Sequence, residues 1–534
     1  MNETDINRHP VRRVRSLAVA VVAALACLLG CHAEPLPTGL RPPNVVLINA
    51  DDLGFGDVGC YGATKLKTPN IDALAQRGRR FTDAHAASAV CSPSRYGLLT
   101  GTYPLRANMW GPLPLRQPLA IDTSRPTLAS LFQQAGYDTA CVGKWHLGFG
   151  EGRTDWNGKL APGPNACGFD YYFGLPVVNS GPPFVYIEND AVVGYDPKDP
   201  FVYGKQSATK VHPAKGGYNA IGGAEAAHRL YDDNAVGTTF ADKASAWIKE
   251  RPADQPYFLY LATSNIHHPF TPAKRFEGTS DAGPYGDFVH ELDWIVGRVV
   301  AAIEARGDLD NTLIIFTSDN GGMLNVGGQT AWERGHRLNG DLLGFKFGAW
   351  EGGHRVPFIA AWPNRIPAGT TSGRLVSHID LLATFASLLD QAIDTGPDSI
   401  DQLPELLGNT DKPLRDELVV LCNSPRHLAI RTARWLYIPA QDEGGFDAKN
   451  RGDHLLGGAA ALRFTGQVNS DVNADGRIKP GSPKVQLYDL RADPSQATNV
   501  AEAHPDVVRS LHARVEAYRA QIPDTKPLGW LSPQ

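Results

Sequence analysis

The sequence predicts an α/β protein with a large, mostly parallel sheet flanked by helices, followed by a smaller α+β subdomain. Short apolar runs rich in β-branched residues recur along the chain, and polar, glycine-rich sequence follows each of them. Amphipathic segments with helical spacing lie between these runs. The 534 residues include 55 glycines and 40 prolines, which favours one large domain, one smaller domain and long shaped loops.

The N-terminal segment is typical of an export signal. Four arginines between residues 8 and 15 precede the apolar run 17–29, which is shorter than the roughly 20 residues needed to span a bilayer. The run ends in Leu28-Leu29-Gly30-Cys31, which resembles a bacterial lipobox, where the cysteine is lipidated and becomes the mature N-terminus. Ordinary cleavage nearby, which leaves a soluble protein, is the alternative. We expect an exported protein that is periplasmic, anchored in the outer membrane through Cys31, or secreted.

The composition predicts a division of the chain into four parts. Residues 1–31 are the expected signal, of the lipoprotein type, and the proline-rich stretch 32–43 is a tether. Residues 44–410 form the expected catalytic domain, and 411–534 the smaller subdomain. Its expected elements are strands at 418–421, 435–438 and 485–490, and a final helix with one apolar face.

Charge and cysteine content exclude two classes of protein. The net charge of −5 argues against nucleic-acid binding, which normally requires a basic face. The seven cysteines do not have the spacing of a zinc site. Without Cys27 of the signal, Cys31 and Cys91, four remain, and an oxidising compartment permits disulfides among them whose pairing the sequence does not give.

Unusual polar residues follow four of the expected strands, 45–48, 139–142, 257–262 and 312–316. Because ligands bind beyond the carboxyl ends of parallel strands, we expect these residues to form one site. The residues, in the order of the strands, are Asp51 and Asp52, Lys144 and His146, His267 and His268, and Asp319 and Asn320.

The acidic residues of this set are typical cation ligands. Asp51, Asp52, Asp319 and Asn320 offer three carboxylates and an amide, which suit Ca²⁺ or Mg²⁺ better than Zn²⁺. Each pair alone is more typical of a turn or a helix cap than of a metal site. Together, and followed by a Gly-Gly turn, they favour a metal site.

The stretch Cys91-Ser92-Pro93-Ser94-Arg95 predicts an anion site beside a sulfur nucleophile. Pro93 suits the first position of a helix, with Ser92 as its cap, which places Cys91 where free backbone N–H groups favour an anion. Arg95 lies one turn further and adds a fixed positive charge. A buried cysteine before a structural helix is the alternative.

Two long stretches carry a resemblance to a known family. Residues 89–101, AVCSPSRYGLLTG, closely resemble the signature of the type I sulfatases, and residues 136–146, GYDTACVGKWH, resemble the same family's second signature. The likeness extends from Asn44 to about Asn499. The sequence is therefore identified as similar to formylglycine-dependent sulfatases of the arylsulfatase and N-acetylgalactosamine-6-sulfatase kind, in the alkaline phosphatase superfamily.

The resemblance implies an alkaline-phosphatase-like fold, a sulfuric ester hydrolase activity and a modified nucleophile. A separate maturation enzyme would oxidise Cys91 to formylglycine (3-oxoalanine), whose oxygen would join Asp51, Asp52, Asp319 and Asn320 around one calcium ion per chain. The implied catalytic residues are Cys91, Arg95, Lys144, His146, His267 and Lys346.

The resemblance also implies a role for each catalytic residue. Arg95, Lys144 and Lys346 would bind the sulfate. His267 would protonate the leaving group, although its neighbour His268 is an alternative, and His146 would accept a proton in the release of sulfate. His354 and Arg355, close after Lys346, have no assigned role.

The expected substrate is a sulfated oligo- or polysaccharide. A phosphodiester or phosphonate monoester hydrolase of the same superfamily is one alternative, and a non-catalytic sulfated-glycan-binding protein is another. Two weaker patterns remain open. Aromatic residues between about 150 and 235 suit either sugar stacking or loop packing, and residues 471–476 suit an Asp-rich turn better than a second calcium loop.

Overall fold

The computed structural model describes residues 41–206, 209, 220–445 and 456–531. The expected signal 1–31, with Cys31, and most of the tether 32–43 lie outside the described residues. Residues Arg41–Gln534 form one compact unit, so the division between residues 410 and 411 stays a prediction. Within the described part of the chain, no helix is both long and apolar enough to cross a bilayer.

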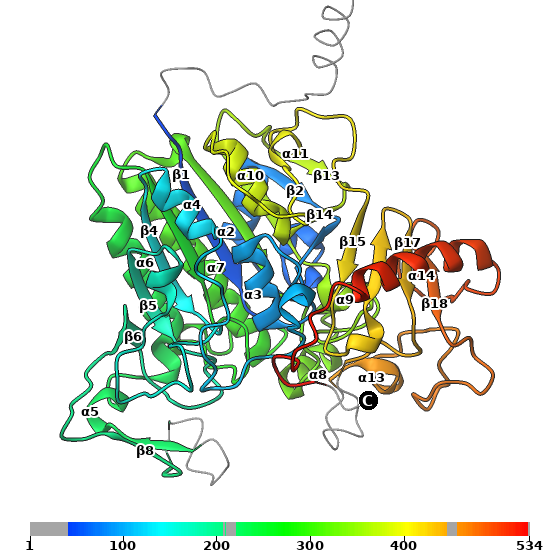
Figure 1. Ribbon diagram of the computed structural model, residues 1–534, viewed down its shortest axis with the longest axis horizontal. Coiled ribbons are helices and arrows are strands. Elements are labelled where there is room, and N and C mark those ends of the chain that lie inside the picture. Colours follow the sequence, from blue (N-terminus) through cyan, green and yellow to red (C-terminus); the bar gives the residue numbers. More distant parts are fainter. Residues whose placement is uncertain (1–40, 207–208, 210–219, 446–455, 532–534) are drawn as a thin grey trace, which may run out of the picture. The chain divides into compact units, whose positions relative to one another are not determined.

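A ten-stranded sheet forms the centre of this unit, and its middle is parallel (Figure 1). The four expected strands are adjacent in the order β11-β1-β10-β4, and β5 continues the parallel part. The edges are mixed, because β12 and β6 pair antiparallel with their neighbours. In sheet order the strands are β13 (Thr370–Ser372), β2 (Arg79–Phe81), β12 (Phe358–Ala361), β11 (Thr312–Ser318), β1 (Asn44–Ala50), β10 (Tyr257–Ala262), β4 (Asp138–Lys144), β5 (Tyr171–Leu175), β6 (Ile187–Glu188) and β7 (Ala191–Val192).

Helices cover both faces of the sheet, so every residue of β1, β10 and β11 is buried. Apolar stripes of one helical layer, which includes α7, pack on Val46, Ile48 and Leu259. On the other face, Phe132 of α4 stacks on Phe258 of β10 at 4.3 Å between ring centroids. The first layer contains α2 (Pro69–Arg77), α6 (Val236–Lys249) and α7 (Pro284–Ala305), and the second α3 (Cys91–Thr100), α4 (Leu128–Gln134) and α10 (Leu381–Leu388).

A separate four-stranded antiparallel sheet forms the C-terminal part, as expected from the sequence. Leu511 and Val515 of α14 pack on its inner residues, including Ile430 and Tyr437. The sequence did not predict β16, which lies between two of the expected strands. The elements are β15 (Glu417–Val420), β16 (Ala429–Thr432), β17 (Trp435–Ile438), β18 (Gln486–Asp489) and α14 (Pro505–Arg519).

Several short elements lie in the loops between the main ones. They are β3 (Ala84–His85), β8 (Phe201–Tyr203), β9 (Ile221–Gly223), β14 (Val376–Ser377), α5 (Glu225–His228), α8 (Val326–Glu333), α9 (Glu351–His354), α11 (Leu403–Leu407) and α13 (Gly458–Thr465). The α/β prediction, with a mostly parallel sheet and a smaller C-terminal sheet, is confirmed.

One buried carboxyl group of α7 makes the stability of the fold depend on pH. Glu291 accepts hydrogen bonds from Asn265 Nδ2 at 3.1 Å and from the backbone N–H of Ala273 at 3.4 Å. Its burial raises the pKa of Glu291 to about 7.

Glu291→Gln should remove this dependence. Because the folded pKa is raised, the folded state holds the proton more tightly than the unfolded chain, and this stabilisation is lost as the pH rises through about 7. We expect the wild type to lose up to about 3 kcal/mol relative to the variant between about pH 5 and pH 8. Urea unfolding midpoints across that range measure the difference. Glu304→Gln, a half-exposed position of the same helix, is the matched control, and equal slopes for all three proteins would contradict the assignment.

Candidate active site

The carboxyl ends of four parallel strands bring the expected site residues together. Ala50 pairs with Ser318, and Asn49 pairs with Ala262, which in turn pairs with Gly143. The residues that follow these positions therefore meet at one edge of the sheet. Carboxylate oxygens of Asp51, Asp52 and Asp319 lie within 4.8 Å of one another, and all three residues are buried.

Three basic side chains neutralise these carboxylates. Lys144 Nζ lies 2.8 Å from Asp51 Oδ2, and Lys346 Nζ donates to Asp52 Oδ1. Arg95 donates from Nη2 at 2.8 Å and from Nε at 3.0 Å to Oδ2 of Asp319. Arg95 Nη2 also lies 3.6 Å from Asp51 Oδ1, so three cations and three carboxylates form one connected cluster.

Cys91 begins helix α3 beside these charges. It is buried, and the burial raises the pKa of its thiol, while the nearby ammonium groups of Lys144 and Lys346 act in the opposite direction. The thiol is therefore held in its neutral form. One expectation was wrong, because Val90 occupies the cap position of the helix and Ser92 does not. The Ser92 hydroxyl instead accepts the N–H of Leu113 at 3.0 Å.

Two histidines of the site have clearly different hydrogen bonds. His146 Nε2 lies 3.2 Å from the carbonyl oxygen of Leu113 and donates to it, so Nδ1 carries the lone pair, and no described group bonds to it. Burial and the charges of Lys144 and Arg95 hold the pKa of His146 well below its usual range. His267 donates from Nδ1 to the carbonyl oxygen of His268, which leaves Nε2 directed at Asp52 Oδ2, 3.9 Å away.

The geometry favours His267 over His268 as the site residue. His267 is buried at the acidic cluster, whereas His268 is half-buried and stacks on its neighbour with 4.4 Å between ring centroids. Asp52 and His146 have φ angles of 63° and 57°, in the left-handed region that is uncommon outside glycine, and aspartate and histidine are among the residues that adopt it more often.

Asn339, which no sequence pattern marks, connects two loops of the site. Asn339 is buried, accepts the N–H of Gly322 at 2.9 Å and donates to the carbonyl oxygen of Gly344 at 2.9 Å. The backbone N–H of Lys346 donates to Gly322 O at 3.0 Å. The turn after Asn320 and the loop with Lys346 are therefore fixed to each other. An Asn-Gly pair in a single sequence is read as a turn, which hides this role.

The small C-terminal sheet also supports the site. The N–H of Ala89 donates to Leu421 O at the end of β15, and the N–H of Phe347 donates to Ala89 O, both at 2.8 Å. The N–H of Asn423 completes the connection to Phe347 O at 3.0 Å. The segments that lead to Cys91 and carry Lys346 are thereby tied to each other and to this sheet.

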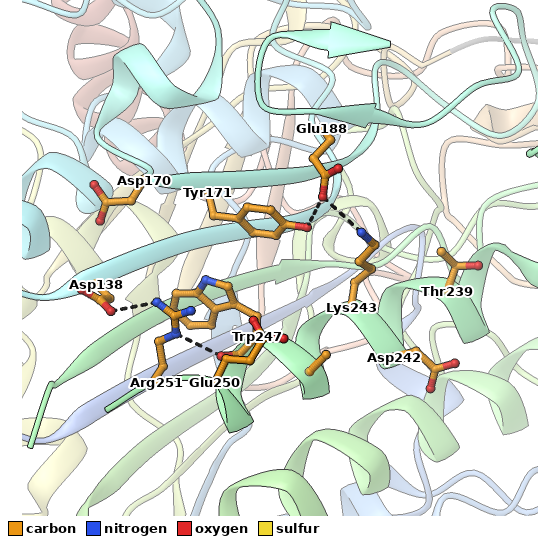
Figure 2. A pocket seen from close by; sticks show the side chains of 11 residues that line it. Asp138, Asp170, Tyr171, Glu188, Thr239, Asp242, Lys243, Trp247, Glu250 and Arg251 are labelled. Carbon is orange, nitrogen blue, oxygen red and sulfur yellow. Dashed lines mark hydrogen bonds and ion pairs between the residues drawn. The ribbon is translucent and has the colours of Figure 1, made fainter. Parts of the chain in front are cut away.

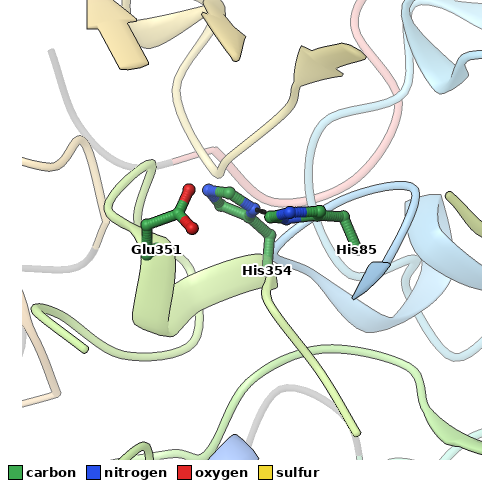
Figure 3. A group of neighbouring side chains, drawn as sticks. All are labelled: His85, Glu351 and His354. Carbon is green, nitrogen blue, oxygen red and sulfur yellow. Dashed lines mark hydrogen bonds between the residues drawn. The ribbon is translucent and has the colours of Figure 1, made fainter. Parts of the chain in front are cut away.

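A second buried polar cluster contains His85, Glu351 and His354 (Figure 3). The Nδ1 atoms of the two histidines are 2.9 Å apart, which requires a shared proton, and His85 Nε2 lies 3.0 Å from Asp83. Arg431 of β16 donates to Asp83 and Glu351. Because these groups already satisfy one another and include an arginine, the cluster is a structural connection between the two sheets. His354, unassigned from the sequence, belongs to this cluster, and Arg355, also unassigned, forms an ion pair with Glu351.

A groove of about 820 Å³ lies at the opposite ends of the strands (Figure 2). It is lined by Asp138, the first residue of β4, whereas Lys144 at the last position of that strand belongs to the acidic cluster. Two basic residues, Lys243 and Arg251, face an excess of acidic groups there. The groove therefore does not suit a small anion. Its acidic residues are Asp138, Asp170, Glu188, Asp242 and Glu250.

The two weaker sequence patterns have structural explanations. Trp156, Tyr172 and Phe173 are buried and pack the loops, whereas Tyr171 is only partly buried and lines the groove of Figure 2. Asp471 accepts a hydrogen bond from Asn499 Nδ2 at 2.6 Å, and a β-bridge joins Val472 and Ile478, as in a closed turn. The permitted disulfides are absent from the described residues, where Cys60, Cys91, Cys141, Cys167 and Cys422 are free.

Comparison with known proteins decides the family. The sequence model of the sulfatase family matches residues 43–391. The chain belongs to the sulfatase family. An N-acetylgalactosamine-6-O-sulfatase of Bacteroides thetaiotaomicron is 37% identical over 95% of this chain and 99% of its own length. Human arylsulfatase A is 32% identical over 95% of this chain and 91% of its own length.

A solved sulfatase structure confirms the fold and the enzyme class. It comes from work on glycosaminoglycan metabolism by Bacteroides thetaiotaomicron and is 36% identical to this chain. Its TM-score is 0.78, and the match covers 90% of this chain and 100% of the other. This sulfatase is thus a sulfuric ester hydrolase with the alkaline-phosphatase-like fold that the sequence predicted.

Arg431→Met tests the connection between the two sheets. Removing the guanidinium leaves Asp83 and Glu351 buried with less positive charge, so we expect a loss of about 3 to 5 kcal/mol in unfolding free energy. Arg434→Met is the matched control. It removes a surface ion pair to Asp489, where the arginine side chain is 49% exposed, and should lower the unfolding free energy far less than Arg431→Met does. Equal losses in urea unfolding would contradict the proposed connection.

Proposed function

We propose that this sulfatase hydrolyses sulfate esters of a sulfated carbohydrate, with formylglycine made from Cys91 as nucleophile and one calcium ion as cofactor. The observation that carries the proposal is the position of Cys91, at a helix N-terminus beside Lys144, Lys346 and a buried cluster of three carboxylates. A separate maturation enzyme is the implied partner, because an unmodified, neutral thiol is a poor nucleophile.

The acidic cluster fits a calcium ion. Asp52 Oδ2 and Asn320 Oδ1 are buried and accept no hydrogen bond from any described residue, which is costly unless a cation occupies the space between them. Asp51, Asp52, Asp319 and Asn320 supply only oxygen ligands, as calcium prefers, and an oxygen of modified residue 91 would complete the set. When bound, the ion offsets sulfate charge and lowers the pKa of the attacking hydroxyl.

Charge balance supports an anionic substrate. The site's three cations and three carboxylates cancel, so a divalent ion leaves the site with an excess positive charge that suits a sulfate group. In the proposed roles, Arg95, Lys144 and Lys346 hold the sulfate oxygens. Arg95 is fixed in its orientation by the bonds to Asp319 and by donation to the carbonyl oxygen of Lys144 at 3.1 Å.

Proton transfer is assigned to the two histidines. The hydrated aldehyde supplies one hydroxyl for attack on sulfur and a second whose deprotonation expels sulfate, which serine or cysteine does not offer. His267 protonates the departing alkoxide from Nε2 as the sulfur–oxygen bond of the ester breaks. Burial and the charges of His268 and Lys346 hold the pKa of His267 well below its usual range, so the protonated form that this step requires depends on the negative charge of bound sulfate. His146 accepts the second hydroxyl proton at its unpaired Nδ1.

Similarity supports the substrate class. The 37% identical relative named above is an N-acetylgalactosamine-6-O-sulfatase, so we infer a sulfated oligo- or polysaccharide as substrate and an amino sugar sulfated at O6 as the first compound to test. The N-terminal pattern supports an exported enzyme, in the periplasm, attached to the outer membrane by a lipid on Cys31, or secreted. No role in nucleic-acid binding is proposed.

Mass spectrometry tests the nucleophile. In a host with the maturation enzyme, the intact mass should be about 18 Da below that of the unmodified chain, because CHO replaces CH₂SH. Cys91→Ser should abolish the shift and lower kcat on an aryl sulfate by at least about 1000-fold, since serine lacks the second hydroxyl. An unshifted mass in the mature host would favour a glycan-binding protein. A higher kcat/KM on an aryl phosphodiester than on an aryl sulfate would favour the phosphodiesterase alternative.

Calcium binding has a readout independent of activity. After removal of metal with a chelator, added Ca²⁺ should raise the Tm, because a ligand that binds only the folded state stabilises it. Asp319→Asn should lose most of this increase. Asp493→Asn, a surface carboxylate of a turn outside the cluster, should retain it. A calcium response that is the same in all three proteins would reject the assigned ligands.

A further inference from the structure

The loop 111–118 forms part of the wall of the active site. Leu113 donates its N–H to the hydroxyl of Ser92, the neighbour of Cys91, and accepts a hydrogen bond from Nε2 of His146. Leu115 lies on the side of the loop that faces Gly181, close to Asn179 and therefore to the segment of His267. The loop thus lies beside three parts of the site, namely the start of α3, His146 and the segment of His267.

Arg116, in the same loop, carries a positive charge that the catalytic site does not use. Its Nε donates to the carbonyl oxygen of Thr154 at 2.7 Å, which fixes the plane of the guanidinium. Among the described residues no carboxylate forms an ion pair with Arg116, and its two terminal nitrogens have no hydrogen-bond acceptor. The side chain is only partly buried, so these nitrogens are open to a ligand.

An aromatic ring packs against one face of this guanidinium. The central carbon of Arg116 lies 4.0 Å from the ring centroid of Tyr203, in a cation–π contact. The hydroxyl of Tyr203 donates to Asp155 at 2.9 Å and accepts the N–H of Trp156 at 2.8 Å, so the ring itself is held in place. A cation that is already oriented loses little conformational entropy when it binds an anion.

The distance from the reaction centre suits a neighbouring sugar. Arg116 is three residues beyond Leu113, so its Cα lies at most about 11 Å from the Cα of the residue that contacts Ser92 and His146. A second sugar unit linked to the one that carries the sulfate ester would lie at such a distance. Sulfated polysaccharides carry carboxylates or further sulfates on neighbouring units, whereas aryl sulfates do not.

We propose that Arg116 and Tyr203 form a subsite that binds a second anionic group of the substrate. This group would lie on the sugar next to the one whose sulfate is cleaved. The proposal rests on the function proposed above. The two terminal nitrogens of Arg116 match the paired oxygens of a carboxylate or sulfate. The subsite would favour glycans with several anionic groups over sugars whose only anionic group is the sulfate ester that is cleaved.

The test compares kcat/KM on four compounds. They are 4-nitrophenyl sulfate, a 6-sulfated N-acetylgalactosamine linked to glucuronate, the same disaccharide with its carboxylate reduced to an alcohol, and a disulfated disaccharide without uronate. Arg116→Gln should lower kcat/KM on the uronate disaccharide about 10- to 100-fold more than on the aryl sulfate, mainly through KM. The reduced disaccharide should show no such difference. The fourth compound decides whether a sulfate can replace the carboxylate.

Two further variants separate a binding role from a structural one. Arg116→Lys should keep part of the preference for the uronate disaccharide over the aryl sulfate in kcat/KM. Tyr203→Leu should lose part of that preference. Arg153→Gln, at an exposed arginine next to Thr154, is the matched control and should leave all four values unchanged. An equal loss on all compounds, or no loss on any, would overturn the subsite. Failure of the proposed function would give a different result. In that case the wild-type enzyme, with its mature aldehyde, would cleave none of the sulfated sugars.

Discussion

The burial of three carboxylates within 4.8 Å of one another is the constraint on which the rest of the site depends. Like charges in a buried place repel strongly, and each also loses its hydration. The fold compensates with a cation for each carboxylate, namely Lys144, Lys346 and Arg95. These cations are then the groups that a tetrahedral anion would meet, so the elements that stabilise the site are the same ones that prepare it for a sulfate.

The strand order explains how segments far apart in sequence reach one place. Strands β11, β1, β10 and β4 are parallel neighbours in register, so the residues just after them necessarily meet. Lys346 follows no strand of this kind. Its position depends instead on Asn339 and on the backbone connection from Ala89 and Phe347 to β15. The C-terminal sheet is therefore part of the active-site scaffold, although it supplies no catalytic side chain.

Sequence reasoning predicts what local patterns encode. A buried parallel strand is a continuous apolar run, so the four central strands and the polar residues after them could be found without a structure. The strands β2 and β13 have three residues each, too few for a period to appear, and β16, Ala-Ile-Arg-Thr, has no continuous apolar run. Arg431 and Asn339 act through contacts far along the chain, and no single-sequence pattern marks such partners. The cap at Ser92 failed because Ser92 bonds to Leu113 instead.

Substrate choice must come from residues outside the charged cluster. Every cation of the cluster is engaged with a carboxylate, and a sulfate group is the same on any ester that carries it. Discrimination between one sulfated molecule and another therefore requires groups that contact the rest of the molecule. The loop 111–118 contacts Ser92 and His146 through Leu113, and it carries Arg116, which contacts Tyr203 and has no carboxylate partner among the described residues. Because this segment is a loop, it can change without disturbing the sheet that holds the catalytic residues.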